Sequence, residues 1–201
     1  MNAAAETVND LKVLQVAGSL FFRHGYEGTL ISQISKEAGV RPPTIYWYYK
    51  SKAGLLASFL ETLVQDVLNE TSPTVEATSP IDRLRHFVHG HVVSILRSYG
   101  EYDAYGAQHG FNELVACLEP ERQAGILEKV TAYIAAFRAI LIEGEADGSM
   151  AFDDITVTSR AILTMTDNCF TWFRPGGRLE IDEVAAQYAD IAARIVAVSN
   201  D

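Results

Sequence analysis

The stretch from residue 29 to residue 52, TLISQISKEAGVRPPTIYWYYKSK, constrains the fold more than any other part of the chain. Ile34 and Ala38 share one helical face, and Gly39 follows them as a residue that adopts a positive φ at little cost. A second short helix is expected after Arg41, because prolines are tolerated in a first turn whose N–H groups lack intrahelical partners. The pattern predicts a helix-turn-helix.

The second predicted helix leaves an unusual outer surface. Ile45 and Tyr49 are four residues apart and face inward, so hydroxyls, ring edges and cations remain outside, where they suit phosphate oxygens and base edges in a major groove. Thr29 is expected to cap the first helix through its hydroxyl. An aromatic-rich hairpin buried in a core is the alternative, which the neighbouring cations disfavour. The predicted DNA-binding residues are Thr29, Arg41, Pro42, Thr44, Tyr46, Trp47, Tyr48, Lys50 and Lys52.

Charge is divided unevenly along the chain, whose formal net charge is −10. Residues 1–52 hold six Lys and Arg against four Asp and Glu, a net charge of +2, and the remaining residues carry −12. DNA is negatively charged, so it attracts the basic N-terminal part (the head) and repels the acidic remainder of the chain (the body). The division therefore favours DNA binding through the N-terminal part alone.

The other segments also show helical periodicity, and no strand-like alternation occurs. In the first half of the chain we expect an amphipathic helix over 6–24, a connecting helix over 52–70 and a loop over 71–80. A further helix should begin at 79 and end at a looser stretch over 98–110, followed by a short helix around 111–118. Three longer helices are then expected: one over 120–146, one from a cap at Asp153 or Asp154 to Phe173, and one over 181–198. The predicted fold class is all-α: a three-helix helix-turn-helix head plus a larger helical ligand-binding and dimerisation domain.

The N-terminal quarter of the chain resembles the TetR family of transcriptional regulators. The residues that carry this resemblance are Val13 to Ala17, Phe21, Gly25-Tyr26, Thr29, Ile34, Ala38-Gly39-Val40, Thr44-Ile45-Tyr46, Tyr49, Ser51-Lys52 and Leu55-Leu56. The segment 41–43, Trp47 and Ser35 depart from the family pattern. These departures leave the expected fold unchanged and concern the DNA sequence that is read. The resemblance implies DNA binding and dimerisation through a four-helix bundle.

The last two predicted helices, joined by the turn at 174–178, form a hairpin with two apolar sides. Ile162 and Cys169 mark one side of the first helix, and Ile155 and Leu163 mark another. Such a hairpin needs a second partner, and a copy of the same chain is the simplest one. A homodimer would hold two heads about one turn of DNA apart, roughly 34–36 Å.

Aromatic, sulfur and polar side chains gather in two parts of the second predicted domain. Between bundle helices they suit an apolar ligand with a polar anchor, and plain core packing is the alternative for each of them. The predicted ligand-binding residues are Tyr99, Tyr102, Tyr105, His109, Phe111, Met165, Phe170, Trp172 and Arg174.

A sparser resemblance links the C-terminal part to one TetR branch. Its residues are Glu143-Gly144, Gly148, Phe152 and the run from Trp172 to Leu179. The resemblance implies regulation of fatty-acid or sterol breakdown and an acyl-CoA thioester as effector. Because the body is acidic, an Arg such as Arg174 or Arg178 would have to contact the CoA phosphates.

Several other functions find no support in the sequence. No nucleophile motif or phosphate-binding loop occurs, so neither enzymatic activity nor a cofactor is expected. Cys117 and Cys169 fit neither a disulfide framework nor a zinc pattern. His86 and His89 can share a helical face, but His91 points elsewhere, and no metal site is expected. Without a membrane span or a signal peptide, the expected location is the cytoplasm.

Together these observations predict a ligand-responsive transcriptional regulator, most simply a repressor. It would bind a pseudo-palindromic operator as a homodimer and be released by an apolar small molecule or an acyl-CoA. The predicted domains are a DNA-binding head over 1–52, a connecting helix over 53–70, and a ligand-binding and dimerisation domain over 73–201. The alternative is a dimeric helical module that binds a small molecule or a protein and has no DNA function.

Overall fold

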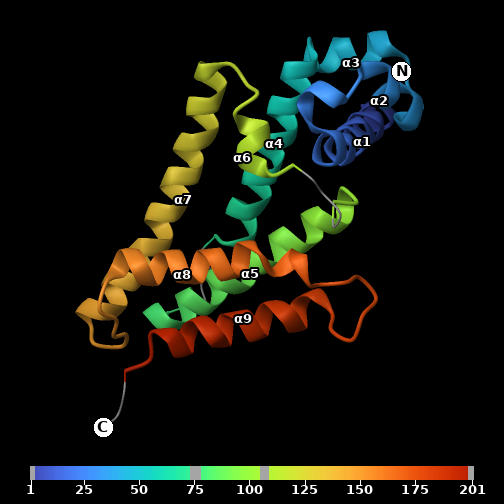
Figure 1. Ribbon diagram of the computed structural model, residues 1–201. Coiled ribbons are helices and arrows are strands. Elements are labelled where there is room, and N and C mark those ends of the chain that lie inside the picture. The colour runs from blue at the N-terminus through green and yellow to red at the C-terminus, as the bar shows by residue number, and fades with distance from the viewer. Residues whose placement is uncertain (1–2, 73–77, 105–108, 199–201) are drawn as a thin grey trace. The chain divides into compact units, whose positions relative to one another are not determined.

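The computed structural model describes residues 3–72, 78–104 and 109–198, and within these ranges every regular element is a helix (Figure 1). The elements are α1 (Ala3–Gly28), α2 (Ile31–Ala38), α3 (Pro42–Tyr49), α4 (Lys52–Glu70), α5 (Pro80–Glu101), α6 (Phe111–Val115), α7 (Pro120–Ala146), α8 (Ile155–Asp167), a 3₁₀ turn (Cys169–Thr171) and α9 (Ile181–Ile195). The all-α prediction is confirmed.

The chain packs as two compact units. One comprises residues 1–64 and 98–128, and the other comprises 65–97 and 129–201. The long helices α4, α5 and α7 each contribute residues to both units. The predicted domain limits at 52 and 73 stay a prediction, because units of packing need not coincide with functional domains.

The first unit is built around aromatic side chains. Phe22 contacts Phe59 with ring centroids 5.4 Å apart, and Tyr102 contacts Phe59 at 4.9 Å. Gly18 on α1 lets these rings approach the helix backbone, since a Cβ there would lie 2.4 Å from a Phe59 ring carbon. The Ser19 hydroxyl donates to the Tyr102 carbonyl and ties the two segments together.

The second unit buries one layer of aromatic rings between its helices. Phe87 on α5 stacks on Tyr133 and on Phe137 of α7, with 4.8 Å between ring centroids in each pair. Ile162 of α8, Ala189 and Ala192 of α9, and Val196 directly after α9 complete the core. Large aromatic side chains each remove much apolar surface from water, so this stack is a main source of the unit's stability.

Most helix limits follow the sequence signals, and a few differ. Asp154 is the cap of α8, because its carboxylate accepts from the backbone N–H of Thr156 at 2.7 Å and of Val157 at 2.8 Å. The helix expected to reach Phe173 ends earlier, at Asp167, where the Asn168 amide donates to a carbonyl of the last turn. In contrast, α5 continues to 101 through the start of the stretch expected to be irregular. None of the described helices is long and apolar enough to cross a membrane.

Helix α5 passes very close to the end of α4 at Gly90. A Cβ at this position would lie 2.1 Å from the Glu70 carbonyl oxygen, a distance that backbone atoms cannot accommodate without moving. Beside this contact the Arg97 guanidinium forms a 2.5 Å ion pair with the Glu70 carboxylate. The second unit therefore requires glycine where α5 crosses the last turn of α4.

Replacing Gly90 by Ala should lower the free energy of unfolding by about 1–3 kcal/mol, the usual cost of overpacking. Gly125→Ala in α7 is the matched control, because nothing lies within 4 Å of a Cβ there. Alanine favours helix over glycine, so the control should be neutral or stabilising by up to about 1 kcal/mol. Urea denaturation of both variants measures the difference, and equal stability would contradict the close approach.

Candidate functional site

Helices α2 and α3 form the predicted helix-turn-helix, although its start differs from the expectation. Thr29 does not cap α2: its hydroxyl donates to the Gly25 carbonyl at 2.8 Å, and the side chain is 0% exposed. Leu30 precedes the helix instead, and the Gln33 side chain accepts from its backbone N–H at 2.9 Å. A fully buried hydroxyl needs an acceptor close by, and the end of α1 supplies one. The buried Thr29 side chain offers no surface to DNA.

Helix α3 is attached to α1 by one strong polar contact. The Tyr49 hydroxyl donates to the Asp10 carboxylate, and burial, followed by this hydrogen bond, raises the pKa of Tyr49 well above its ordinary value. The phenol therefore stays protonated and remains a donor. Ile45, also buried, adds the apolar contact that the sequence predicted.

The junction after α3 is short and tightly packed. Lys50 has φ 63°, which lies in the left-handed region, and only Lys50 and Ser51 separate α3 from α4. In the first turn of α4, a Cβ on Gly54 would lie 2.0 Å from the Tyr49 carbonyl oxygen. The Ser51 hydroxyl accepts from the Gly54 N–H at 2.9 Å. These contacts fix the direction of α3 relative to the start of α4.

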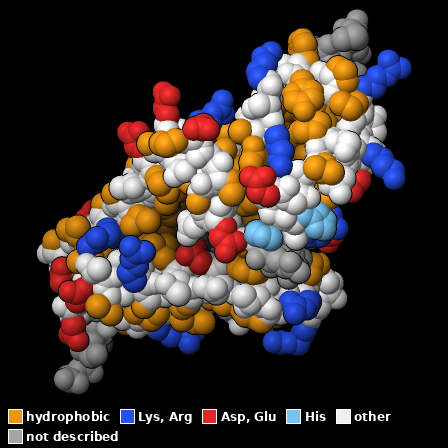
Figure 2. Space-filling view, turned by 45° about the horizontal axis from the view of Figure 1, so that its top comes forward, with side chains coloured by type: hydrophobic (Ala, Val, Ile, Leu, Met, Phe, Trp, Pro, Cys, Tyr) orange, Lys and Arg blue, Asp and Glu red, His pale blue; other side chains and the backbone are white. Residues whose placement is uncertain are grey.

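The outer side of α3 presents the predicted DNA-binding side chains. Tyr46 is 47% exposed and Trp47 is 64% exposed, which is unusual for large aromatic residues. The other predicted residues divide into exposed ones (Arg41, Pro42, Lys50) and half-buried ones (Thr44, Tyr48, Lys52). In Figure 2, Lys and Arg side chains project around hydrophobic ones on the head, at the upper right.

Lys52 has a partner inside the head. Its ammonium lies 4.2 Å from the centroid of the Tyr26 ring, which stands at the end of α1. Such a cation–π contact holds the side chain beside the helix-turn-helix. The charge of Lys52 thus stays near the exposed surface of α3 in a fixed position.

The predicted ligand-binding residues fall in both packing units. Tyr99, Tyr102, His109 and Phe111 belong to the first unit, Met165, Phe170, Trp172 and Arg174 belong to the second, and Tyr105 lies outside the described residues. Tyr99 and Tyr102 pack on Phe22 and Phe59 as part of the aromatic core of the first unit. For these two side chains the structure shows the core packing that was the alternative.

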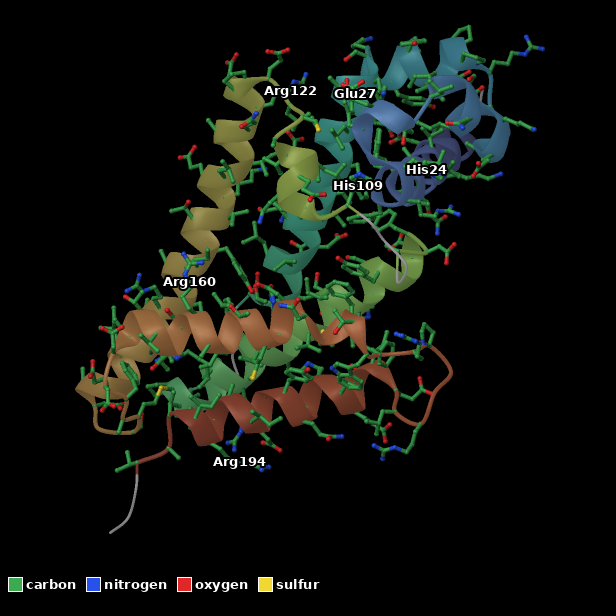
Figure 3. The ribbon with its side chains drawn as sticks, in the orientation of Figure 1. His24, Glu27, His109, Arg122, Arg160 and Arg194 are labelled. Atoms are coloured by element: carbon green, nitrogen blue, oxygen red, sulfur yellow. The ribbon has the colours of Figure 1, made fainter. Side chains whose placement is uncertain are left out.

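His109 lies against the end of α1, near His24 in Figure 3. Its backbone N–H donates to the Phe22 carbonyl at 3.2 Å, and its ring occupies the space beside Gly25, where a Cβ would lie 2.9 Å from Nε2. Gly25 has φ 70°, so it interrupts the helical geometry of α1 where the sequence predicted that helix to end. His109 therefore packs against this bend.

Trp172 and Arg174 lie at the surface of the second unit. The Trp172 indole N–H donates to the Tyr188 hydroxyl at 3.0 Å and the two rings stack, yet half of the Trp172 surface remains exposed. The Arg174 guanidinium donates to the Phe173 carbonyl at 2.7 Å. This arrangement orders the turn between α8 and α9.

The sequence did not predict a polar chain that runs from the exposed Asp167 to the buried His91 and Tyr133 of the second unit. His91 Nε2 lies 2.9 Å from an Asp167 carboxylate oxygen, and the Tyr133 hydroxyl lies 2.7 Å from His91 Nδ1. Because a carboxylate only accepts, Nε2 carries the proton, and Nδ1 accepts from Tyr133. Burial, followed by the Asp167 charge, raises the pKa of Tyr133 well above its ordinary value and keeps it a donor. These residues come from three helices, so no local pattern could reveal them.

The other two histidines have separate partners. His86 Nε2 lies 2.7 Å from the Ser72 carbonyl oxygen, and His89 Nε2 lies 3.9 Å from an Asp182 carboxylate oxygen. Over the described ranges, no group of three His, Cys, Asp or Glu side chains is placed to hold a metal ion.

Helices α8 and α9 keep an apolar surface outside the core of their unit. Val157 is 68% exposed, and Ile191 and Ile195 are each more than 40% exposed. The apolar side marked by Ile162 was a candidate for the contact between two copies, but Ile162 is fully buried in the core of its own chain. The reason is that α9 faces the core with Val184 and a series of alanines, which lets α8 pack closely. In Figure 3, Arg160 on α8 and Arg194 on α9 point to opposite sides of the hairpin.

Two protein families match the chain. Residues 77–196 match the family described as tetracyclin repressor-like, C-terminal domain, and residues 13–59 match the family described as bacterial regulatory proteins, tetR family. Among whole proteins, the HTH-type transcriptional repressor KstR2 of Rhodococcus jostii is 25% identical over 186 residues, which cover 90% of this chain and 87% of the relative.

Two solved structures share the fold. The ketosteroid transcriptional regulator KstR2 of Mycobacterium tuberculosis has a TM-score of 0.79 at 21% identity, covering 94% of this chain and 95% of that one. AibR in complex with isovaleryl coenzyme A and operator DNA has a TM-score of 0.72 at 21% identity, covering 94% of this chain and 97% of that one.

Replacing Tyr49 by Phe should lower the free energy of unfolding by about 1.5–3 kcal/mol, the range for hydrogen bonds to charged groups. Tyr46→Phe removes a hydroxyl from an exposed ring on the same helix, and its effect should stay within about 0.5 kcal/mol. Thermal and urea unfolding measure both variants. A Tyr49→Phe variant as stable as the parent would show that the Asp10 contact does not hold α3 in place.

Proposed function

The chain belongs to the TetR family of bacterial regulatory proteins, and we propose that it represses transcription by binding a pseudo-palindromic operator as a homodimer. An apolar small molecule or an acyl-CoA would release it from DNA. The observation that carries this proposal is the outer side of α3, where Tyr46 and Trp47 are exposed beside Arg41 and Lys50. A recognition helix needs these chemical groups at its surface.

Each group on this surface has a role in the proposal. Arg41 and Lys50, one at each end of α3, pair with phosphates and set the position of the helix on the duplex. The Tyr46 hydroxyl and the Trp47 ring, which lie between them, contact base edges and thymine methyl groups in the major groove. The net charge of +2 over residues 1–52, against −12 for the rest, favours approach by this side alone.

A homodimer accounts for the exposed apolar surface of α8 and α9. Val157, Ile191 and Ile195 would be buried between two copies, in a self-complementary contact of the kind that two-fold dimers make. Two heads then contact two half-sites of an operator, and the contacts of one head alone would be half as many.

The ligand response is supported by what is known of the structural neighbours. One of them is a ketosteroid regulator, and another was solved with isovaleryl coenzyme A and operator DNA. For the present chain, a ligand that binds the free dimer better than the DNA-bound dimer must lower operator affinity by the same factor. Such regulation needs no reaction, and we propose that the protein is not an enzyme.

The other candidate is a dimeric helical module that binds a ligand or a protein but not DNA. The exposed cations and rings of α3 favour the regulator, because a module without DNA function has no use for them. Selection of genomic fragments by the purified protein distinguishes the two. The regulator should enrich discrete sites, and the alternative should enrich none.

Tyr46→Ala should weaken binding to the selected operator by about 1–3 kcal/mol per subunit, through lost base contacts. Lys50→Gln should flatten the plot of log affinity against log salt by about 0.9 per lost phosphate contact. Lys129→Gln, on the exposed side of α7, removes the same charge elsewhere and should change neither quantity. Fluorescence anisotropy over a salt series measures all three. Unchanged binding by both head variants would exclude α3 as the recognition helix.

Val157→Arg and Ile195→Arg should each convert the dimer to a monomer, because an unpaired charge in a closed apolar contact costs several kcal/mol. Leu127→Arg, at an exposed position of α7, is the matched control and should leave the assembly unchanged. Sedimentation velocity gives the assembly state, and circular dichroism checks the fold. Intact dimers of both interface variants would place the interface elsewhere.

A further inference from the structure

Three side chains on one side of α5 face the interior of the second unit. Helical residues are about 100° apart, so Phe87, His91 and Ser94 lie within roughly 60° of one another around the axis. Phe87 stacks on Tyr133, and His91 accepts from the Tyr133 hydroxyl. Ser94, one turn further along the same side, continues this surface.

A neighbouring side of α5 contacts the end of α4. Gly90 lies against the Glu70 carbonyl, and Arg97 pairs with the Glu70 carboxylate. Around the helix axis, Ser94 lies between these two residues and the Phe87–His91 side. It therefore stands between the contact with the last turn of α4 and the contact with α7.

The Ser94 hydroxyl has no hydrogen-bond partner among the described residues, although the side chain is only 2% exposed. Two other buried hydroxyls of the second unit donate to carbonyls four residues earlier in the chain. Thr71 bonds to Val67 at 2.8 Å, and Thr166 bonds to Ile162 at 3.0 Å.

Arg83 Nε is the other buried atom of this unit without a hydrogen-bond partner among the described residues, but its guanidinium is already paired with Glu143. Because buried polar groups are normally hydrogen-bonded, the unpartnered Ser94 hydroxyl is a candidate for a role outside folding.

We propose that the Ser94 hydroxyl is the polar anchor of the effector and donates a hydrogen bond to a carbonyl oxygen on an apolar ligand. This inference rests on the ligand response proposed above and assigns its specificity to one residue. The apolar part of the ligand packs against Phe87 and Tyr133. Tyr133 is a positioning residue here, because its hydroxyl is already bonded to His91.

The surroundings select a neutral carbonyl over a carboxylate. Arg83, on the inner side of α5, is paired with Glu143 at 2.5 Å, and Arg97 at the edge of that side is paired with Glu70, so neither charge is left to balance a carboxylate. A single hydroxyl cannot offset the cost of removing a full negative charge from water, whereas it satisfies a ketone or thioester oxygen. The ligand class is therefore an apolar ketone or an acyl thioester.

Two pairs of probes that differ in the carbonyl test the anchor. Octanoyl-CoA is compared with S-octyl-CoA, and androst-4-ene-3,17-dione with androst-4-ene, by equilibrium dialysis against the full-length protein. Ser94→Ala should weaken binding of a carbonyl-bearing probe about two- to tenfold and leave its partner without the carbonyl unchanged. Whichever pair responds identifies a thioester or a ketone as the ligand.

Ser159→Ala is the matched control, because its buried hydroxyl donates to the Thr156 carbonyl at 3.2 Å. It should bind all probes as the parent does. Equal affinities of parent and Ser94→Ala for both carbonyl probes would overturn the proposal, as would equal losses with and without the carbonyl, or no binding of any probe.

A measurement without ligand gives an independent result. Removing an unpartnered hydroxyl should raise the midpoint of thermal unfolding of Ser94→Ala by a few degrees, and Ser159→Ala should lower it. A lower midpoint for Ser94→Ala would show that the hydroxyl is already bonded, which overturns the proposal. Operator binding by Ser94→Ala should match the parent. If the parent protein binds no operator DNA, that result contradicts the proposed function. The dialysis measurements would still test whether Ser94 binds a carbonyl oxygen.

Discussion

Helices of eight residues are too short to be stable alone in water, so α2 and α3 depend on the surface that α1 gives them. Ile34 and Ala38 of α2 and Ile45 of α3 are buried, and the Tyr49–Asp10 hydrogen bond adds a directional contact. Because the inner side chains of α3 are used for packing against the rest of the head, its remaining side chains face outward. The proposed DNA-binding surface is thus a consequence of the packing that makes the helices exist.

The second unit depends on a different kind of contact. Its aromatic layer is apolar, but the chain Asp167–His91–Tyr133 crosses it and joins α8, α5 and α7 by hydrogen bonds. Directional bonds fix the register of helices that apolar packing alone would leave free to slide. Ser94 stands beside this ordered layer without a partner of its own, and the contrast makes it the natural place for ligand specificity.

The sequence predicted best what is decided locally. The limits of α3, α4 and α7 follow from prolines, glycines and apolar periodicity, and the structure reproduces them. The exposed side of α3 was also predictable, since Ile45 and Tyr49 define its inner side. The role predicted for Thr29 was wrong, because a hydroxyl between two helices can bond to either of them. The buried Thr29 hydroxyl donates to the Gly25 carbonyl of α1 and does not cap α2.

Contacts between distant segments could not be predicted. His91 and Asp167 are 76 positions apart, and nothing local marks them as partners. Ile162 was misplaced for a similar reason, because its burial depends on the alanines of α9. The proposed ligand-binding set mixed core aromatics such as Tyr102 with surface residues such as Trp172, since composition alone does not show which side of a helix is covered.

The two-residue junction after α3 has a mechanical consequence. Gly54 and Tyr49 are in backbone contact there, so α3 cannot turn independently of α4. The two helices are therefore expected to move as one rigid body. A helix of 19 residues is about 28 Å long, and by simple geometry a tilt of about 5° moves its far end by roughly 2.5 Å. In the proposed regulator, α3 and the start of α4 would therefore change direction together, without any unfolding of the head.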